Sequence, residues 1–121
     1  MPDHIFSLIE ILVVNSYYAF DGCSSNPLSA FDDDPPGYLS ELSKAHIQCC
    51  SLDGNSCSRK NGEFCRSGVS DDEKVTWKEA NQHCEEDGMR LCSYQEELDR
   101  CCSQGCQYDN QLVWSDLMEG N

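Results

Sequence analysis

Cysteine is the residue type whose number and spacing most clearly indicate chemistry in this chain. There are ten cysteines in 121 residues, and nine of them fall between Cys49 and Cys106. At this density in a short chain, cysteines usually form disulfides in an oxidising compartment. All ten are therefore predicted to be disulfide-bonded: Cys23, Cys49, Cys50, Cys57, Cys65, Cys84, Cys92, Cys101, Cys102 and Cys106.

The positions of these cysteines constrain their pairing. Adjacent cysteines rarely bond to each other, because the small ring strains the peptide and disulfide geometry is specific. The pairs Cys49-Cys50 and Cys101-Cys102 are each expected to send two bridges to different elements. Since the nine clustered cysteines are odd in number, Cys23 is expected to supply the tenth partner and to tie the N-terminal segment to them. The remaining connectivity stays open.

Zinc binding and redox catalysis are the alternatives for so many cysteines. A zinc site needs thiolates and histidines at ligand spacing, and no Cys-x2-Cys occurs in the chain. The nearest candidates, Cys102-x3-Cys106 and His83-Cys84, lack matching partners at the usual distance. A thioredoxin-type motif is missing for the same reason. No metal or cofactor is therefore predicted.

Histidines and carboxylates are the other residues that could serve catalysis. His46 and His83 are interpreted as packed or solvated, because neither accompanies a serine in a Gly-x-Ser-x-Gly turn. The acidic runs are interpreted as solvated surface, and Asp53-Gly54-Asn55 lacks the spacing and terminal glutamate of an EF-hand loop. No catalytic residue is predicted, and we expect a protein that is not an enzyme.

The overall charge excludes some partners. The chain has 22 acidic against 8 basic side chains, a net charge of −14. Nucleic acids are held by Lys and Arg contacts to phosphate, so a nucleic-acid partner is not expected. The same charge disfavours binding to anionic membrane surfaces.

Two helices are predicted to position the cysteines of the C-terminal part. Thr76-Trp77-Lys78-Glu79 is a capping box, followed by an apolar stripe of Trp77, Ala80 and Cys84, and Gly88 marks the stop. Ser93-Tyr94-Gln95-Glu96 is read as a second capping box, opening a helix that carries Leu98 and the Cys101-Cys102 pair. Trp77 and Trp114 are expected in the core.

Short strands are predicted at residues 45–50, 89–92 and 111–114. The expected fold class is α+β: a small disulfide-rich module with two short capped helices on a small antiparallel sheet, preceded by an extended N-terminal arm. A module of about 75 residues buries too little apolar surface to be stable alone, so the disulfides are expected to decide whether it folds.

A family resemblance follows from these motifs. The pattern Thr76-Trp77-x-Glu79-Ala80-x-x-x-Cys84, then Gly88-x-x-Leu91 and a helix with Glu96-Glu97, resembles the opening half of a C-type lectin-like domain. Residues 45–116 are similar to a short cysteine-rich variant that ends in Gly-Cys-x-Tyr-Asp-Asn-x-Leu-Val-Trp. The long calcium-binding loop and its Glu-Pro-Asn or Gln-Pro-Asp triplet are absent from this sequence. The resemblance therefore does not imply calcium-dependent glycan binding.

Composition divides the chain into residues 1–44 and 45–121. The first part contains an acidic, proline-containing stretch, Asp-Asp-Asp-Pro-Pro-Gly, typical of a linker or extended arm. Its residues 5–20 are largely apolar but lack a positive n-region and are short for a membrane span. Three interpretations stay open: a degenerate signal or membrane anchor, a helix docking on a partner, and a disordered tail or gene-model artefact.

The turn Tyr108-Asp109-Asn110 is predicted to be an exposed recognition group, since loops carry binding more often than strands do. We expect a non-enzymatic extracellular or lumenal module that serves recognition or adhesion through protein contacts. The alternative is a structural subunit of a larger extracellular, surface-filament or lumenal membrane-associated assembly, with the N-terminal arm wrapping its partners and residues 5–20 in contact with a membrane.

Overall fold

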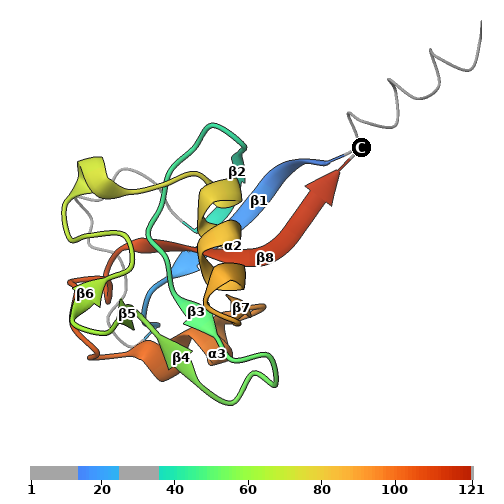
Figure 1. The fold of residues 1–121 in the computed structure, drawn as a ribbon. Coiled ribbons are helices and arrows are strands. Elements are labelled where there is room, and N and C mark those ends of the chain that lie inside the picture. Colours follow the sequence, from blue (N-terminus) through green and yellow to red (C-terminus); the bar gives the residue numbers. More distant parts are fainter. Residues whose placement is uncertain (1–13, 25–35, 121) are drawn as a thin grey trace, which may run out of the picture.

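The structure is a computed structural model that describes residues 14–24 and 36–120 (Figure 1). The predictions made for residues 5–13 and for the acidic proline stretch at 25–35 lie outside this part of the chain. The elements are β1 (Val14–Asp21), β2 (Gly37–Ser40), β3 (Cys49–Cys50), β4 (Cys57–Ser58), β5 (Lys60–Asn61), β6 (Phe64–Cys65), η1 (Asp71–Glu73), α2 (Trp77–Glu86), β7 (Arg90–Leu91), α3 (Gln95–Leu98), η2 (Asp99–Cys101) and β8 (Leu112–Gly120). Two short α-helices, small antiparallel sheets and five disulfides confirm the predicted α+β class.

The largest sheet is antiparallel in the order β2-β1-β8, and two of its strands precede Lys44. Ala19 of β1 lies opposite Trp114 of β8 and joins it in the core. The division at residue 44 did not anticipate that residues 14–21 and 37–40 pair with the C-terminal strand. A docking helix is the wrong interpretation for residues 14–20, because these residues form strand β1, which pairs with β2 and β8.

The remaining strands are short. β3 pairs with both β4 and β7, and β5 pairs with β6 in a hairpin, all antiparallel. The strand predicted from Ala45 is reduced to two residues, and its first part makes single bridges from Ala45 to Val75 and from His46 to Val113. β8 runs six residues beyond the predicted end at Trp114, because its outer part continues to pair with β1.

Helix α2 has the predicted ends. Thr76 Oγ1 accepts from the Glu79 amide at 3.3 Å, and the Thr76 amide donates to Glu79 Oε1 at 2.9 Å. Trp77, Ala80 and Cys84 are the buried residues of the helix. Gly88 has a φ of 73°, and the Met89 amide donates to Cys84 O at 2.9 Å, so the helix ends in a Schellman motif.

Helix α3 begins differently from the prediction. The N-cap residue is Tyr94, whose side chain makes no capping bond, and Glu96 is exposed. Glu97 takes the expected role instead, because its Oε1 accepts from the Ser93 amide at 2.7 Å. The same carboxylate is buried and pairs with Arg90 at 2.8 Å. The prediction of a second capping box is therefore wrong, since no side chain caps this helix. The ion pair with Arg90 explains why Glu97 and not Glu96 accepts from the Ser93 amide.

Two packed clusters form the interior. The first surrounds the fully buried Trp114 and includes Trp77, which confirms the expected core role of both indoles. The second is built mainly of cysteines, with Leu98, Tyr108 and Val113 between them. In the described residues, no helix has both the length and the apolar composition to cross a membrane.

Candidate functional site

All ten cysteines are paired, as predicted. The five bridges are Cys23–Cys102, Cys49–Cys84, Cys50–Cys92, Cys57–Cys101 and Cys65–Cys106. Each adjacent pair sends its two bridges to different elements, and Cys23 supplies the tenth partner. The sequence predicted these three features of the pairing but not the complete connectivity.

Three of these bridges converge on one short segment, residues 101–106. They tie Cys101 to β4, Cys102 to Cys23 after β1, and Cys106 to β6. Each of these cross-links restricts the conformations that the segment can adopt. Residues 101–106 are therefore bonded covalently to three other parts of the chain.

This fixed segment borders an open hollow of about 530 Å³. The residues that line it are Arg59, Ser103, Gly105, Gln107, Asp109 and Asn110. We call these residues the polar hollow. Two of the three residues of the predicted recognition turn, Asp109 and Asn110, lie in it, and the other lining residues were missed by the sequence interpretation.

Arg59 is the buried residue of the polar hollow, and it binds two of the other lining residues, Gly105 and Asp109. Its side chain is fully buried, with Nε donating to Gln48 Oε1 at 2.8 Å and Nη2 donating to Gly22 O at 3.3 Å. Nη1 donates to Gly105 O at 3.0 Å and lies 2.6 Å from Asp109 Oδ1. Burial lowers the pKa of Arg59, and the hydrogen bond and negative charge of Asp109 oppose that change. The pairing explains how a cation is tolerated in this interior position.

The backbone around the polar hollow adopts unusual conformations. Ser103, Cys106 and Gln107 have positive φ values of 65°, 63° and 61°, which cost energy in residues with a β-carbon. The Cys65–Cys106 bridge and a 3.1 Å bond from the Ser103 amide to Asp109 Oδ1 hold two of these positions. A cross-link and a tertiary hydrogen bond thus hold two of the residues whose conformations are locally unfavourable.

Tyr108 does not lie where the sequence placed it. The expectation that it is exposed is wrong, because its exposed fraction is 0%. Its hydroxyl donates to Gly68 O at 2.6 Å and accepts from the Ser67 amide at 3.0 Å, so the phenol finds partners in the interior. Burial raises the pKa of Tyr108. The residue anchors the turn and leaves Asp109 and Asn110 to form its outer surface.

His46 is the buried histidine of this region. Its ring stacks on Tyr108 with centroids 4.4 Å apart, and Nδ1 lies 2.9 Å from Ser67 Oγ. Burial, together with the charge of Lys74, lowers the pKa of His46 to about 4, so the ring is neutral at neutral pH. Ser67 is also buried, and its hydroxyl accepts from the Ile47 amide at 2.9 Å. The imidazole and hydroxyl are therefore packed into the core, as the interpretation of His46 expected.

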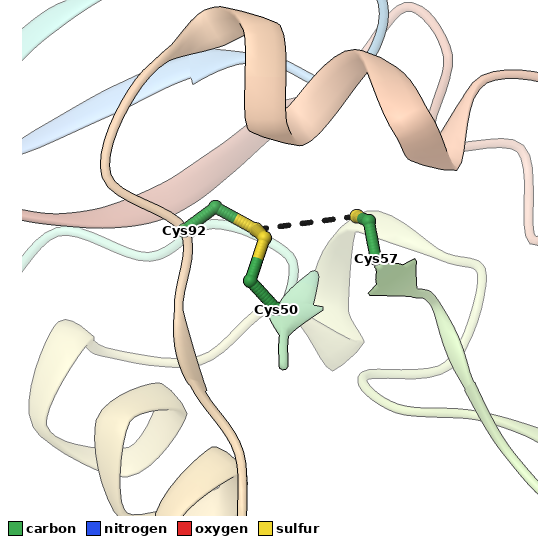
Figure 2. Close-up of side chains that lie close together, drawn as sticks. All are labelled: Cys50, Cys57 and Cys92. Carbon is green, nitrogen blue, oxygen red and sulfur yellow. Dashed lines mark hydrogen bonds between the residues drawn. A yellow bond between two sulfur atoms is a disulfide. The ribbon is translucent and has the colours of Figure 1, made fainter. Parts of the chain in front are cut away.

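Among the described residues, the sulfur atoms of Cys50, Cys57 and Cys92 lie within 4.8 Å of one another. Figure 2 shows the three side chains pointing toward one another. A second group contains the Cys23–Cys102 bridge and Asp99. Metal binding by cysteine requires thiolates, and each of these sulfurs is bonded to another sulfur. In the oxidised protein the first group therefore belongs to two disulfides, and the second is one disulfide beside a carboxylate.

Comparison with known proteins gives no assignment: no family model matches the chain, and neither the search of curated proteins nor that of solved structures finds a match.

Proposed function

We propose that this chain is a non-enzymatic recognition module of the C-type lectin-like type, which binds another protein through the polar hollow. The five disulfides indicate a small domain of an oxidising extracellular or lumenal compartment. The lectin-like assignment rests on the sequence resemblance of residues 45–116, and the binding role rests on the geometry described above.

The observation that carries the proposal is the rigidity of the segment that forms the polar hollow. Three disulfides and the Arg59–Asp109 pair fix this segment before any partner arrives. A binding surface that is already ordered loses less conformational entropy on association, so more of its contact energy appears as affinity. Three disulfides in one polar loop are consistent with selection for a binding surface of fixed conformation.

The chemistry of the lining residues suggests the partner. Asp109 is paired with Arg59, whereas the uncharged side chains of Ser103, Gln107 and Asn110 make no hydrogen bond to another described residue. These groups suit a protein loop that offers backbone amides or uncharged polar side chains. The net charge of −14 around them favours a partner whose surrounding surface is basic.

Site-specific photo-cross-linking of the intact, disulfide-bonded chain tests this proposal. A photoreactive residue at Asn110, in the polar hollow, is compared with one at the exposed Lys78 of α2. In the native extracellular fraction, we expect one protein to be cross-linked from position 110 and not from position 78. Excess unlabelled wild-type chain should compete for this adduct, and a Gln107→Ala/Asn110→Ala variant should not.

Two results would overturn the proposal. The first is equal cross-linking from positions 78 and 110, or equal competition by the variant. The second is calcium-dependent binding of the intact chain to a glycan array, which would replace protein recognition with sugar recognition. Each experiment uses the oxidised protein, and a non-reducing gel checks that the disulfides are intact.

A structural subunit is the second candidate, and the β1–β8 ribbon favours it. The paired ends of these strands extend away from the rest of the fold (Figure 1), and Leu117 and Met118 on β8 are 37% and 52% exposed. Exposed apolar side chains on a projecting ribbon suit burial in a larger assembly. Amide exchange should then be slowed at residues 116–119 in the native assembly relative to the isolated chain; unchanged exchange would contradict it. Membrane contact through residues 5–20 stays a prediction.

A further inference from the structure

Two disulfides lie against each other in the second core cluster. Cys92 Sγ of the Cys50–Cys92 bridge is 4.0 Å from Cys57 Sγ of the Cys57–Cys101 bridge, and Figure 2 shows these sulfurs facing one another. Cys50 Sγ lies within 4.8 Å of both. No other group of three cysteines this close occurs among the described residues. Among the described residues, these two bridges are therefore the ones whose sulfurs form a close group of three.

The strand register explains the proximity. Cys50 of β3 and Cys57 of β4 are directly opposite each other in the antiparallel pair, so their side chains lie on the same face of the sheet. Cys92 follows β7, the other neighbour of β3, and Cys101 lies in η2. The sulfur atoms of Cys50, Cys57 and Cys92 thus lie close together, and Cys101 is bonded to one of them. Besides its native partner, each of the three sulfurs has a second sulfur within 4.8 Å.

We propose that the two bridges form one exchangeable unit, in which a thiolate produced at either bridge attacks the other. A dithiol reductant first converts Cys57–Cys101 to two thiols and is itself oxidised to a disulfide. The Cys57 thiolate then attacks Cys92 Sγ, the Cys57–Cys92 bond forms, and the Cys50–Cys92 bond breaks. Cys50 leaves as a thiolate and takes up a proton. One disulfide and two thiols are present before and after the exchange.

A second exchange, which starts at the other bridge, links the sheet to the polar hollow. When Cys50–Cys92 is reduced, the Cys50 thiolate attacks Cys57 and releases Cys101. Cys101 is the first residue of the segment 101–106, which borders the polar hollow. A dithiol that reduces Cys50–Cys92 can therefore lead to loss of the Cys57–Cys101 bridge, which anchors that segment. The dithiol does not need to react with Cys57–Cys101 itself. This consequence is independent of the identity of any partner of the polar hollow.

Single cysteine substitutions test the exchange. Cys101→Ser leaves Cys57 without its partner, and Cys92→Ser leaves Cys50 without its partner. After incubation at pH 8 and acid quenching, non-reducing peptide mapping of Cys101→Ser should find Cys57–Cys92 together with free Cys50. Mapping of Cys92→Ser should find Cys50–Cys57 together with free Cys101. We expect each exchanged form to reach at least about a tenth of the molecules.

The matched control is Cys84→Ser, which leaves the neighbouring Cys49 free in the first core cluster. No close group of cysteine sulfurs includes Cys49 among the described residues, so its thiol should remain free and the other four bridges should remain native. The proposal is overturned if Cys57 is the only free thiol of Cys101→Ser and Cys50 is the only free thiol of Cys92→Ser. In that case the other four bridges of each variant would be native.

Partial reduction of the wild-type protein provides a second readout that does not depend on the folding of the variants. With less than one equivalent of dithiothreitol, molecules that have lost one of these two bridges should include a population with Cys50 and Cys101 free together. Independent bridges would give only the native partners as free pairs, Cys50 with Cys92 or Cys57 with Cys101. That outcome would also overturn the proposal.

Discussion

The guanidinium of Arg59 lies 2.6 Å from the carboxylate of Asp109, so a fully buried cation is paired with a residue that reaches the surface. The same carboxylate accepts from the amide of Ser103. This pair therefore connects the interior to the polar hollow. Loss of either charge is expected to affect both the surface loop and the core beneath it.

Asp109→Asn tests the pair. The change preserves shape but leaves the buried Arg59 without its counter-charge, so we expect a loss of about 1–3 kcal/mol in the free energy of unfolding. Urea denaturation measures it. Glu85→Gln changes net charge equally at an exposed position of α2 and should stay within about 0.5 kcal/mol of wild type. Equal stability of the two variants would contradict the role of the pair.

The Cys65–Cys106 bridge should hold the polar hollow open. Removing it in Cys65→Ser/Cys106→Ser should destabilise the fold by at most about 4 kcal/mol, since the other bridges already restrict the unfolded chain. The variant should also lose its ability to compete in the cross-linking experiment. Cys49→Ser/Cys84→Ser removes a bridge of similar span in the first cluster and should lose stability but keep competition. Competition by both variants would show that the bridge does not shape the binding surface.

Substitutions of the neighbouring residues Glu97 and Glu96 should lower the free energy of unfolding by very different amounts. Glu97→Gln weakens the bond to the Ser93 amide and removes the charge paired with Arg90, at a cost of about 1–3 kcal/mol. Glu96→Gln changes an exposed side chain and should cost less than about 0.5 kcal/mol. Thermal or urea unfolding of both variants decides the point, and a larger effect at position 96 would support the capping box predicted from the sequence.

His46 should make the fold sensitive to acid. Its pKa is lowered to about 4 in the folded protein by burial, below its value near 6.5 in the unfolded chain. As the pH falls, the unfolded state binds this proton first, so stability is lost from about pH 6.5 down to about pH 4. Between pH 7 and pH 5 the loss from this group is about 2 kcal/mol.

Urea unfolding of wild type and His46→Asn at pH 7, 6 and 5 measures this loss. The variant should be less stable at pH 7 but lose little further stability by pH 5, where carboxylates are still mostly ionised. His83→Asn should retain most of the wild-type pH dependence, because His83 is only partly buried. A wild-type curve that is flat across this range would contradict a neutral, buried His46.

Local sequence signals predicted the local structure well. Thr76 and Glu79 form reciprocal hydrogen bonds within one turn, and Gly88 is the residue with left-handed backbone after α2. Both ends of the helix are therefore determined by residues that are close in the sequence. At α3 the choice between Glu96 and Glu97 depends on Arg90, which packs against the helix from β7. Sequence spacing alone does not contain that contact.

The polar hollow could be predicted only in part. Asp109 and Asn110 were found because turn residues are recognisable, whereas Tyr108 was misplaced because its partners, Ser67 and Gly68, are distant in the sequence. Arg59 was missed since a lone arginine usually lies at the surface. Its burial depends on acceptors from three separate segments of the chain.

Non-reducing peptide mapping of the native protein tests the central claim most directly, namely that covalent bridges fix the shape of this module and its polar hollow. The structure predicts no free thiol and the five pairs Cys23–Cys102, Cys49–Cys84, Cys50–Cys92, Cys57–Cys101 and Cys65–Cys106. Ten free thiols, or thiolates bound to zinc, would contradict both the compartment and the proposed function.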